Sequence, residues 1–234
     1  MTVYDLIDAT WPAAAFRQVG PWTIRTGGGG GSRVSAATAL GPVQADAWAM
    51  AEQAMQELDQ VPIFMIRPGE DALDAQLAAA GYVIKDPVTA YAAPVHTLAA
   101  FELPAKTAFQ AWPPLAIQAE IWAAGGIGPA RMAIMDRVSG PKTSFLGRLR
   151  DQAAGCVFVG CDGAQAMLHA LEVLPDFRRL GLGRHLLIAA ARWAQGQGAQ
   201  SLALVVTRAN AGANALYASL GMDVVGQYHY RIRP

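Results

Sequence analysis

The chain has 234 residues, of which 53% are apolar and 15% are charged, and its formal net charge at pH 7 is zero. This length exceeds the ~100 to 150 residues typical of one domain, so we expect one large or two small domains with a sizeable core. Because acidic and basic residues are balanced and interspersed, no electrostatic field favours nucleic acid or an anionic membrane as a partner.

Targeting and membrane-spanning patterns are not evident. The first residues include Asp5 and Asp8 and lack the apolar core of a signal peptide. The apolar stretch of the most hydrophobic helix, Leu186 to Ala191, is far shorter than the ~20 residues that cross a bilayer. Cys156 and Cys161 have no second cysteine pair or histidine cluster near them, so we expect reduced thiols, no metal site and a cytoplasmic protein.

A glycine run, Gly27 to Gly31, follows a strand-like segment, Trp22 to Arg25, and precedes Ser32 and Arg33. It invites interpretation as a phosphate loop, but it lacks the Gly-Lys-Ser/Thr ending and has a strand on one side only. We therefore expect the run to be a flexible hairpin tip.

The first half then continues with a helix over 45–58, a buried strand over 63–66 and a helix that ends at Gly81, each recognised by its apolar spacing. The alanine-rich segment 86–104 carries three prolines and is the natural place for one unit to hand over to the next. Farther on, Gly125, Gly126 and Gly128 predict a loop between two short helices.

The segment 171–183, LEVLPDFRRLGLG, joins a predicted strand to an amphipathic helix. Arg178, Gly181 and Gly183 form an Arg-x-x-Gly-x-Gly turn at the start of that helix. A helix start presents N–H groups without intrahelical partners and the positive end of the macrodipole, so the turn predicts a cradle for phosphates. The alternative is a dinucleotide-binding turn, which would need Gly-x-Gly-x-x-Gly near the first strand and an acidic residue about 20 positions later.

Downstream of the turn, Ser201 to Val206 predicts a strand, Asn210 opens a turn, and Asn214 to Met222 has the sequence NALYASLGM. Together with the Arg178 turn, these segments resemble the GCN5-related N-acetyltransferase (GNAT) superfamily over roughly residues 101–234. The resemblance implies an α/β (α+β) fold, with a mixed, mostly antiparallel central sheet flanked by helices.

The resemblance also implies how coenzyme A (CoA) would bind. The strand end at Leu171 to Val173 would pair its backbone with the pantetheine arm, and the Val173 N–H would help to hold the thioester oxygen. The turn would bind the diphosphate through backbone N–H groups and the Arg178 guanidinium. Asn210 would cap the turn and either reach the pantetheine through its amide or serve as a cap alone. The implied cofactor-binding residues are Leu171, Val173, Arg178, Arg179, Leu180, Gly181, Leu182, Gly183, Arg184 and Asn210.

For catalysis, the resemblance implies that Tyr217 protonates the CoA thiolate. The base is open: some relatives carry a glutamate where this chain has Val205, which leaves His169, Glu172 or a water chain as candidates. The unperturbed pKa of histidine suits proton abstraction near neutral pH. Strand alternation puts His169 and Glu172 on opposite faces unless a bulge intervenes.

Shifting the chain on itself by 140 residues aligns the two halves. Gly81 falls on Gly221 and strand 63–66 falls on strand 203–206, but residues 38–43 replace the CoA turn with a sequence that has lost its arginine and second glycine. We therefore expect a degenerate GNAT-like unit over 1–97, without its own cofactor, and a catalytic GNAT domain over 98–234.

The resulting hypothesis is an enzyme that moves an acetyl group from acetyl-CoA directly to a primary amine of a small-molecule or amino-acid-like acceptor, without a metal. The alternative is a non-catalytic acyl-CoA sensor or interaction module, which Val205 in place of an acid favours. We expect acetyl-CoA and the amine as partners, neither nucleic acid nor membrane, and a monomer or homodimer. The sequence shows neither an acidic groove nor a basic cluster, so the acceptor stays unidentified.

Overall fold

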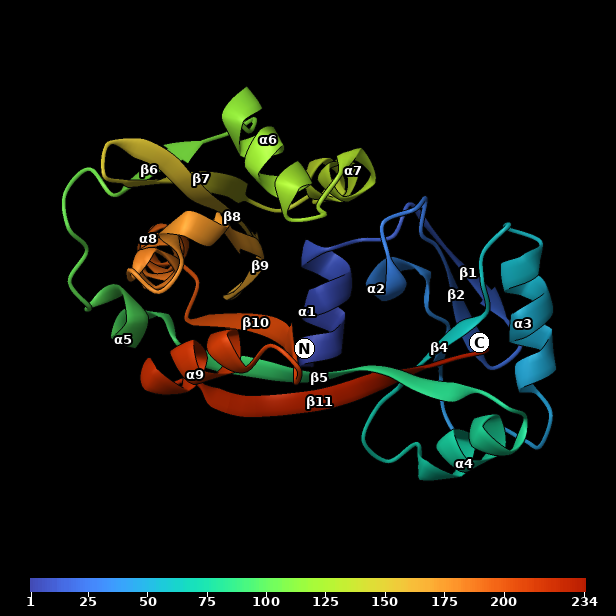
Figure 1. The fold of residues 1–234 in the computed structure, drawn as a ribbon. Helices are drawn as coiled ribbons and strands as arrows, with labels where there is room; N and C mark the ends of the chain where they lie inside the picture. Colours follow the sequence, from blue (N-terminus) through green and yellow to red (C-terminus); the bar gives the residue numbers. More distant parts are fainter.

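The computed structural model describes residues 1–234 and shows two lobes joined by two long strands (Figure 1). An eight-stranded sheet runs through both lobes, and only one strand pair in it, β9 with β10, is parallel. In spatial order its strands are β4 (Ile63–Ile66), β11 (Asp223–Ile232), β5 (Val83–Pro94), β10 (Ser201–Thr207), β9 (Gln165–Val173), β8 (Gln152–Asp162), β7 (Lys142–Leu149) and β6 (Ala108–Ala111). The predicted mixed, mostly antiparallel sheet is confirmed.

Helices flank this sheet, and a second, three-stranded sheet completes the smaller lobe (Figure 1). The small sheet consists of β1 (Ala15–Val19), β2 (Trp22–Thr26) and β3 (Thr38–Ala39). The helices are α1 (Val3–Thr10), α2 (Ser32–Ser35), α3 (Trp48–Gln56), α4 (Asp71–Ala79), α5 (Val95–Ala99), α6 (Ala116–Ala124), α7 (Pro129–Arg137), α8 (Leu182–Gly196) and α9 (Ala211–Ser219). None of them has the length and apolarity needed to span a bilayer.

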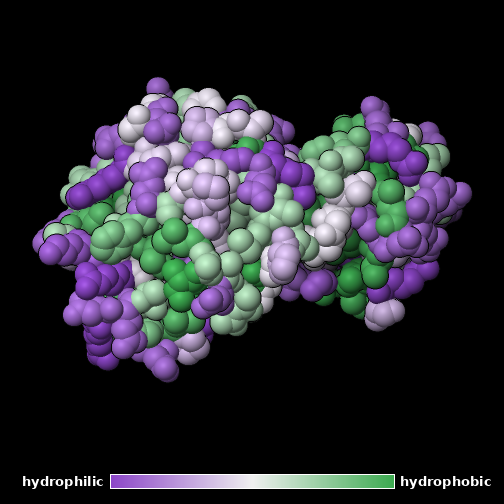
Figure 2. All heavy atoms as spheres, turned by 90° about the horizontal axis from the view of Figure 1, so that it is seen from above, coloured by the Kyte–Doolittle hydropathy of each residue, from purple (hydrophilic) through white to green (hydrophobic).

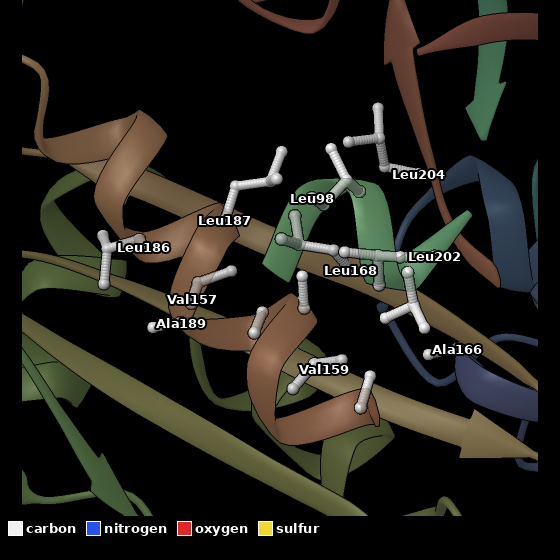
Figure 3. Packing of buried hydrophobic residues seen from close by; sticks show 14 of the residues in the cluster. Leu98, Val157, Val159, Ala166, Leu168, Leu186, Leu187, Ala189, Leu202 and Leu204 are labelled. Carbon is white, nitrogen blue, oxygen red and sulfur yellow. The ribbon is translucent and has the colours of Figure 1, made fainter. Parts of the chain in front are cut away.

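Helix α8 anchors the core of the larger lobe. Its apolar stripe, including Leu186 and Leu187, packs against strands β7, β8 and β9 and against α5 (Figure 3). Gly147 on β7 makes this approach close: a Cβ there would lie 3.0–3.2 Å from the leucine side chains of α8. The core therefore fixes the first turn of α8 against the sheet, and that turn carries the glycine motif.

Seen from above, the molecule narrows between the larger and the smaller lobe, and polar side chains are spread over both (Figure 2). The lobes are held together by exchanged strands. Strand β5 of the first half lies between β11 and β10, and β11 of the second half lies between β4 and β5. The first part of the proline-containing segment 86–104, which we expected to connect two units, is thus an interior strand of the common sheet, and α5 follows it. Strand β5 contains Pro87 and Pro94, and it nevertheless pairs with β11 and β10 over most of its length.

The 140-residue offset recurs in the geometry. Helix α4 begins at Asp71 and α9 at Ala211, and the β4–β11 pair Met65↔Tyr230 corresponds to the β10–β5 pair Val205↔Ala90. This match of helix bounds and strand register supports an internal duplication with exchange of the last strands. The boundary that we predicted between residues 97 and 98 falls within α5 and stays a prediction.

Equivalent contacts tie each exchanged strand to a helix of the other half. On one side, the Tyr91 hydroxyl of β5 donates to Asn214 Oδ1 of α9 at 3.1 Å. On the other, Arg231 of β11 donates to both oxygens of Asp74 on α4 at 2.7 and 3.0 Å, and His229 lies 2.8 Å from the same carboxylate. The hydrogen bond from Arg231 is the main cause that lowers the pKa of the Asp74 carboxyl.

We expect Asp74→Asn to lower the free energy of unfolding by about 1–2 kcal/mol at pH 7, because the ion pair with the largely buried Arg231, which has two hydrogen bonds, is lost. A carboxyl whose pKa is lowered on folding stabilises the folded state at pH values above its ordinary pKa of 3.8. This contribution disappears as the pH falls through the lowered pKa. The free energies of unfolding of wild type and variant, measured with denaturant, should therefore become equal at acidic pH. Asp71→Asn, an exposed change on the same helix, is the control; equal effects of both variants would contradict the assignment.

Candidate active site

A split in the large sheet marks the centre of the site. Strands β9 and β10 pair only from Gln165↔Ser201 to Leu168↔Leu204. Beyond that point β9 continues to Val173 and β10 to Thr207. The edge of β9 that faces β10 therefore has no strand partner over Leu171 to Val173, and its backbone groups remain for a ligand.

A β-bulge reorients the residues of β9 at this split. Phe158 on β8 pairs with His169, and Cys156 on β8 pairs with Glu172. The two pairs are thus two residues apart on β8 but three residues apart on β9. The extra residue is accommodated at Ala170, which has φ +51°. His169 and Glu172 thus lie on the same face, unlike the simple alternation. The carbonyl of Ala170 is held by the buried Trp122 indole, whose Nε1–H donates to it at 2.8 Å.

The glycine turn connects the end of β9 to α8. After a 3₁₀ turn at Pro175–Phe177, Arg179 has φ +64° and Gly181 has φ +85° as the N-cap of α8. Glycine adopts this left-handed conformation without a steric penalty. No side chain caps the helix, and its first amide-to-carbonyl bond runs from His185 to Gly181 at 3.1 Å. The N–H groups of the preceding turn are therefore available to an anion.

Among the side chains of this turn, Arg178 has the geometry to reach a ligand. Its side chain is 57% exposed and donates to the Val173 carbonyl at 2.9 Å and to Glu172 Oε1 at 3.1 Å. Arg179, Leu180 and Gly181 are exposed, whereas Leu182 is buried in the core.

Arg184 and Asn210, two of the remaining predicted cofactor residues, already have contacts within the protein. The Arg184 guanidinium lies 4.3 Å from the ring centre of Phe101, so this residue would contribute its backbone rather than its charge to a diphosphate site. Asn210 caps α9 by accepting from the Ala213 N–H at 3.0 Å, which confirms its capping geometry and leaves its amide group for a ligand. Gly183 has room for a Cβ in ordinary contact with Leu216.

Tyr217 is buried within α9, with 5% of its surface exposed. Its ring packs against Tyr91 at a centroid distance of 5.8 Å. Burial raises the pKa of Tyr217 to about 12, so the phenol keeps its proton at neutral pH. The Tyr217 hydroxyl is therefore a weak acid.

Glu172 lies under the loop between α6 and α7. A Cβ on Gly125 would come within 2.5 Å of Glu172 Oε2, so a larger residue there would require the carboxylate to move. The carboxylate is 17% exposed and pairs with Arg178. The predicted loop at Gly125 to Gly128 is confirmed between the ends of α6 and α7.

His169 is fully enclosed, and both of its ring nitrogens have partners. Arg33 Nη1 donates to Nδ1 at 3.0 Å, and Nε2 lies 2.9 Å from Thr10 Oγ1, whose own hydroxyl donates to the Leu6 carbonyl at 2.6 Å. These partners define a neutral ring protonated at Nε2. Burial, and next the Arg33 charge, hold the pKa of His169 well below its usual value. Trp11 stacks on the ring at 4.9 Å.

A cavity of about 220 Å³ opens beside the split. Its walls come from both halves. The second half supplies the Ala170 bulge, the end of β10 at Val205 to Thr207, and Tyr228 and Tyr230 of β11, whereas the first half supplies Gly30 to Arg33 and the start of β5 at Asp86 and Val88. Three charged side chains line it, namely Arg33, Arg131 and Asp86. Helix α1, which packs on β8 and β9, contributes nearby Trp11 to the wall.

The glycine run also lines this cavity, and the expectation of a flexible hairpin tip is wrong. The hairpin tip lies earlier, between β1 and β2, and the run instead connects β2 to α2. A Cβ on Gly30 would lie 2.6 Å from Ile134 Cδ1 of α7, and one on Gly27 would lie 2.0 Å from Ser35 Oγ. The glycines therefore allow close packing of the first half against helix α7.

Sequence reasoning missed Arg33, Arg131 and Trp11 as site residues. Their positions depend on packing between the two halves, which no local pattern encodes. The available signal was the glycine run itself, since five consecutive glycines, followed by Ser32 and Arg33, suit close approach of a backbone to a neighbouring element.

Comparisons with known proteins agree with this geometry. Residues 99–222, more than half of the chain, match the Acetyltransferase (GNAT) family. A search of curated proteins finds no match. Among solved structures, a GCN5-related N-acetyltransferase from Kribbella flavida has a TM-score of 0.72 at 18% identity, with 99% of this chain and 94% of that chain covered.

Two further solved structures share the fold. A conserved protein of unknown function from Staphylococcus epidermidis ATCC 12228 has a TM-score of 0.73 at 11% identity, with 97% of this chain and 96% of that chain covered. A tandem GNAT protein from the clavulanic acid biosynthesis pathway has a TM-score of 0.60 at 16% identity, with 84% and 74% covered. The chain therefore belongs to the Acetyltransferase (GNAT) family.

Proposed function

We propose that the protein transfers an acetyl group from acetyl-CoA to the primary amine of a small, amino-acid-like acceptor. The observation that carries this proposal is the position of three features side by side: the unpaired edge of β9, the uncapped N-terminus of α8 and the cavity at the end of β10. The cavity borders the bulge of β9, so a bound amine would lie next to a thioester held along that edge.

The residues present fit acetyl-CoA, which when bound supplies an activated acetyl thioester. Gly181 at φ +85° and the uncapped first turn of α8 suit a diphosphate, and Arg178 is exposed beside them. The backbone of Leu171 and Val173 would hold the pantetheine arm and polarise the carbonyl oxygen. Arg178 would exchange its contact with Glu172 for one with phosphate.

Tyr217 is proposed as the acid that gives its hydroxyl proton to the departing thiolate. With the pKa of Tyr217 raised to about 12, the group is a proton donor throughout the neutral range. Asn210, the N-cap of α9 about two turns before Tyr217, would place its amide group on the pantetheine. Both roles rest on the resemblance and on positions next to the sheet split.

The structure favours a positioning role for His169 over that of a base. Its Nδ1 accepts from Arg33 and its Nε2–H is directed at Thr10, so protonation would break the bond to Arg33. Glu172, tied to Arg178, remains a candidate, as does a water chain from the cavity. We propose that the acceptor loses its proton to water or Glu172 before it attacks the carbonyl carbon.

The experiment is to incubate the protein with acetyl-CoA and a panel of amino acids and small amines, and to follow thiol release and acetylated product together. We expect release that depends on the amine, with one acetylated product per thiol. Reactions without amine control for hydrolysis. Thiol release that no amine accelerates would contradict the proposal.

A non-catalytic acyl-CoA sensor is the second candidate. It is favoured by one observation, namely that neither Val205 on β10 nor the locked His169 offers a free base in the cavity. Calorimetry with acetyl-CoA separates the two: a sensor binds the cofactor but releases no thiol with any amine.

We also propose that residues 1–97 form a GNAT-like unit without a cofactor site. At the position equivalent to the glycine turn, Leu40 to Gln44 has no helix start, and α3 begins only at Trp48. Pro42 in this segment lacks an N–H donor. The unit instead supplies strand β5 and one wall of the acceptor cavity.

A further inference from the structure

We infer that Arg33 and Arg131 form a carboxylate clamp, and that the acceptor is an α-amino acid with an apolar side chain. This inference rests on the proposed function and deepens it, because it assigns the substrate class and the residues that select it. Both guanidinium groups line the cavity beside the sheet split. They come from opposite halves of the chain, so the clamp exists only in the assembled fold.

The side chain of Arg33 is fixed by contacts with its neighbours. Its Nη1 donates to Nδ1 of the buried His169, and its guanidinium lies 5.4 Å from the ring centre of Trp11. This is its only hydrogen bond, which leaves the other guanidinium N–H groups for a ligand. A planar donor fork fixed by a neutral histidine and an aromatic face matches the two oxygens of a carboxylate.

Arg131 completes the clamp from α7. Its Nη2 lies 3.3 Å from the position of a Cβ on Gly31, so the glycine gives the side chain room against the loop that precedes Arg33. Its hydrogen bond to the Gly126 carbonyl is long, at 3.4 Å, and no carboxylate pairs with it. Asp86, the one acidic residue in the lining, is exposed and bonded to Lys85 at 2.9 Å. The cavity thus carries an excess of positive charge.

The size and walls of the cavity restrict the rest of the acceptor. At about 220 Å³ the cavity is smaller than the ~300–1,000 Å³ of sites for drug-sized ligands, which favours a single amino acid over a peptide or a large amine. Val88, Ile127, Val206 and Tyr228 provide apolar surface. An amino acid with its carboxylate on the arginines would rest its side chain on this surface and direct its amine to the split.

The test compares L-leucine and L-phenylalanine with their primary amides and with the amines that lack the carboxylate, isoamylamine and phenethylamine. Calorimetry measures binding, and thiol release with product analysis measures kcat/KM. We expect the acids to be preferred on the order of 10-fold or more, and Arg33→Gln or Arg131→Gln to abolish that preference. Arg148→Gln is the control and should change nothing, because Arg148 on β7 forms a surface ion pair with Asp151 in the β7–β8 turn and does not line the cavity.

The outcomes separate this inference from the proposed function. If amides and simple amines are acetylated as well as the acids and Arg33→Gln does not alter the ratio, the clamp is wrong and the acetyltransferase assignment stands. If no amine releases thiol but calorimetry shows leucine or phenylalanine binding that Arg33→Gln abolishes, the clamp stands and the enzymatic function fails. If the acids neither bind nor react, the clamp is wrong.

His169 is assigned as the positioning residue of Arg33. Asparagine at this position places a carbonyl oxygen near Nδ1 and keeps an acceptor for Arg33, whereas leucine removes it. We expect His169→Leu to raise KM on the order of 10-fold for amino acids while kcat/KM for the amides is unchanged, and His169→Asn to restore the low KM. An equal loss for acids and amides in both variants would contradict the role.

Discussion

Tyr217→Phe should lose on the order of 100-fold or more in kcat, with little change in KM for acetyl-CoA. A positioned general acid contributes about 10²–10⁴ to the rate, and phenylalanine cannot supply the proton that the thiolate needs. The hydroxyl makes no hydrogen bond with the protein, so its removal leaves no partner unsatisfied. We therefore expect unchanged folding stability, measured by thermal unfolding beside steady-state kinetics.

Tyr82→Phe is the matched control. Tyr82 is likewise a buried tyrosine, and burial followed by the nearby Glu52 charge raises its pKa to about 12, but it lies in the core of the smaller lobe. Its substitution should leave kcat at the wild-type level. If Tyr217→Phe turns over as fast as Tyr82→Phe, the acid must be sought elsewhere.

The pH profile of the wild type provides a separate check on Tyr217. Because burial raises the pKa of this phenol to about 12, the proton-donating form persists well above pH 10. The kcat of the wild type should therefore not fall with an apparent pKa near 10. A fall at that pH, absent in Tyr217→Phe, would show that the hydroxyl is solvated during turnover.

Gly181→Asp should weaken acetyl-CoA binding roughly 100-fold or more. The added carboxylate would stand at the uncapped start of α8, where a negative charge a few ångströms from the diphosphate costs about 2–4 kcal/mol in a partly solvated site. Asparagine and aspartate tolerate the left-handed conformation of Gly181 better than other residues, so backbone strain stays modest. Calorimetry with acetyl-CoA measures the effect directly, without reliance on turnover.

Two controls isolate the charge from the strain. Gly181→Asn has nearly the same shape without the charge and should bind acetyl-CoA considerably better than Gly181→Asp. Gly198→Asp introduces the same residue at φ +87°, just beyond the other end of α8, where a Cβ meets nothing within 4 Å. Equal losses of acetyl-CoA affinity in Gly181→Asp and Gly198→Asp would mean that the helix as a whole was disturbed. That result would contradict the proposed phosphate site at Gly181.

Local sequence sufficed where a feature depends on a few neighbouring residues. The turn from Arg178 to Gly183 was recognisable because glycine at φ +85° is a local backbone requirement. The helix after it follows from its apolar spacing, and the cap at Asn210 follows from the chemistry of one side chain. Strand Ser201 to Val206 was likewise predicted within one residue of its observed end.

Other features were undetermined because they depend on contacts between residues far apart in the chain. Strand β5, which composition marked as a connector, became an interior strand once β10 and β11 offered partners for its backbone. The bulge at Ala170 is a property of the β8–β9 register, and it placed His169 and Glu172 on one face. The burial of His169 likewise required α1 and Arg33 to pack on β9.

The amino-acid sequence by itself determined the family, the glycine turn before α8 and the order of the elements, because glycine conformation, capping and apolar periodicity act over a few residues. Only the tertiary structure decided that the two halves exchange strands and that Arg33 and Arg131 meet in one cavity. These positions arise when distant segments bury their apolar surface together, and that free energy belongs to the whole fold rather than to any local segment.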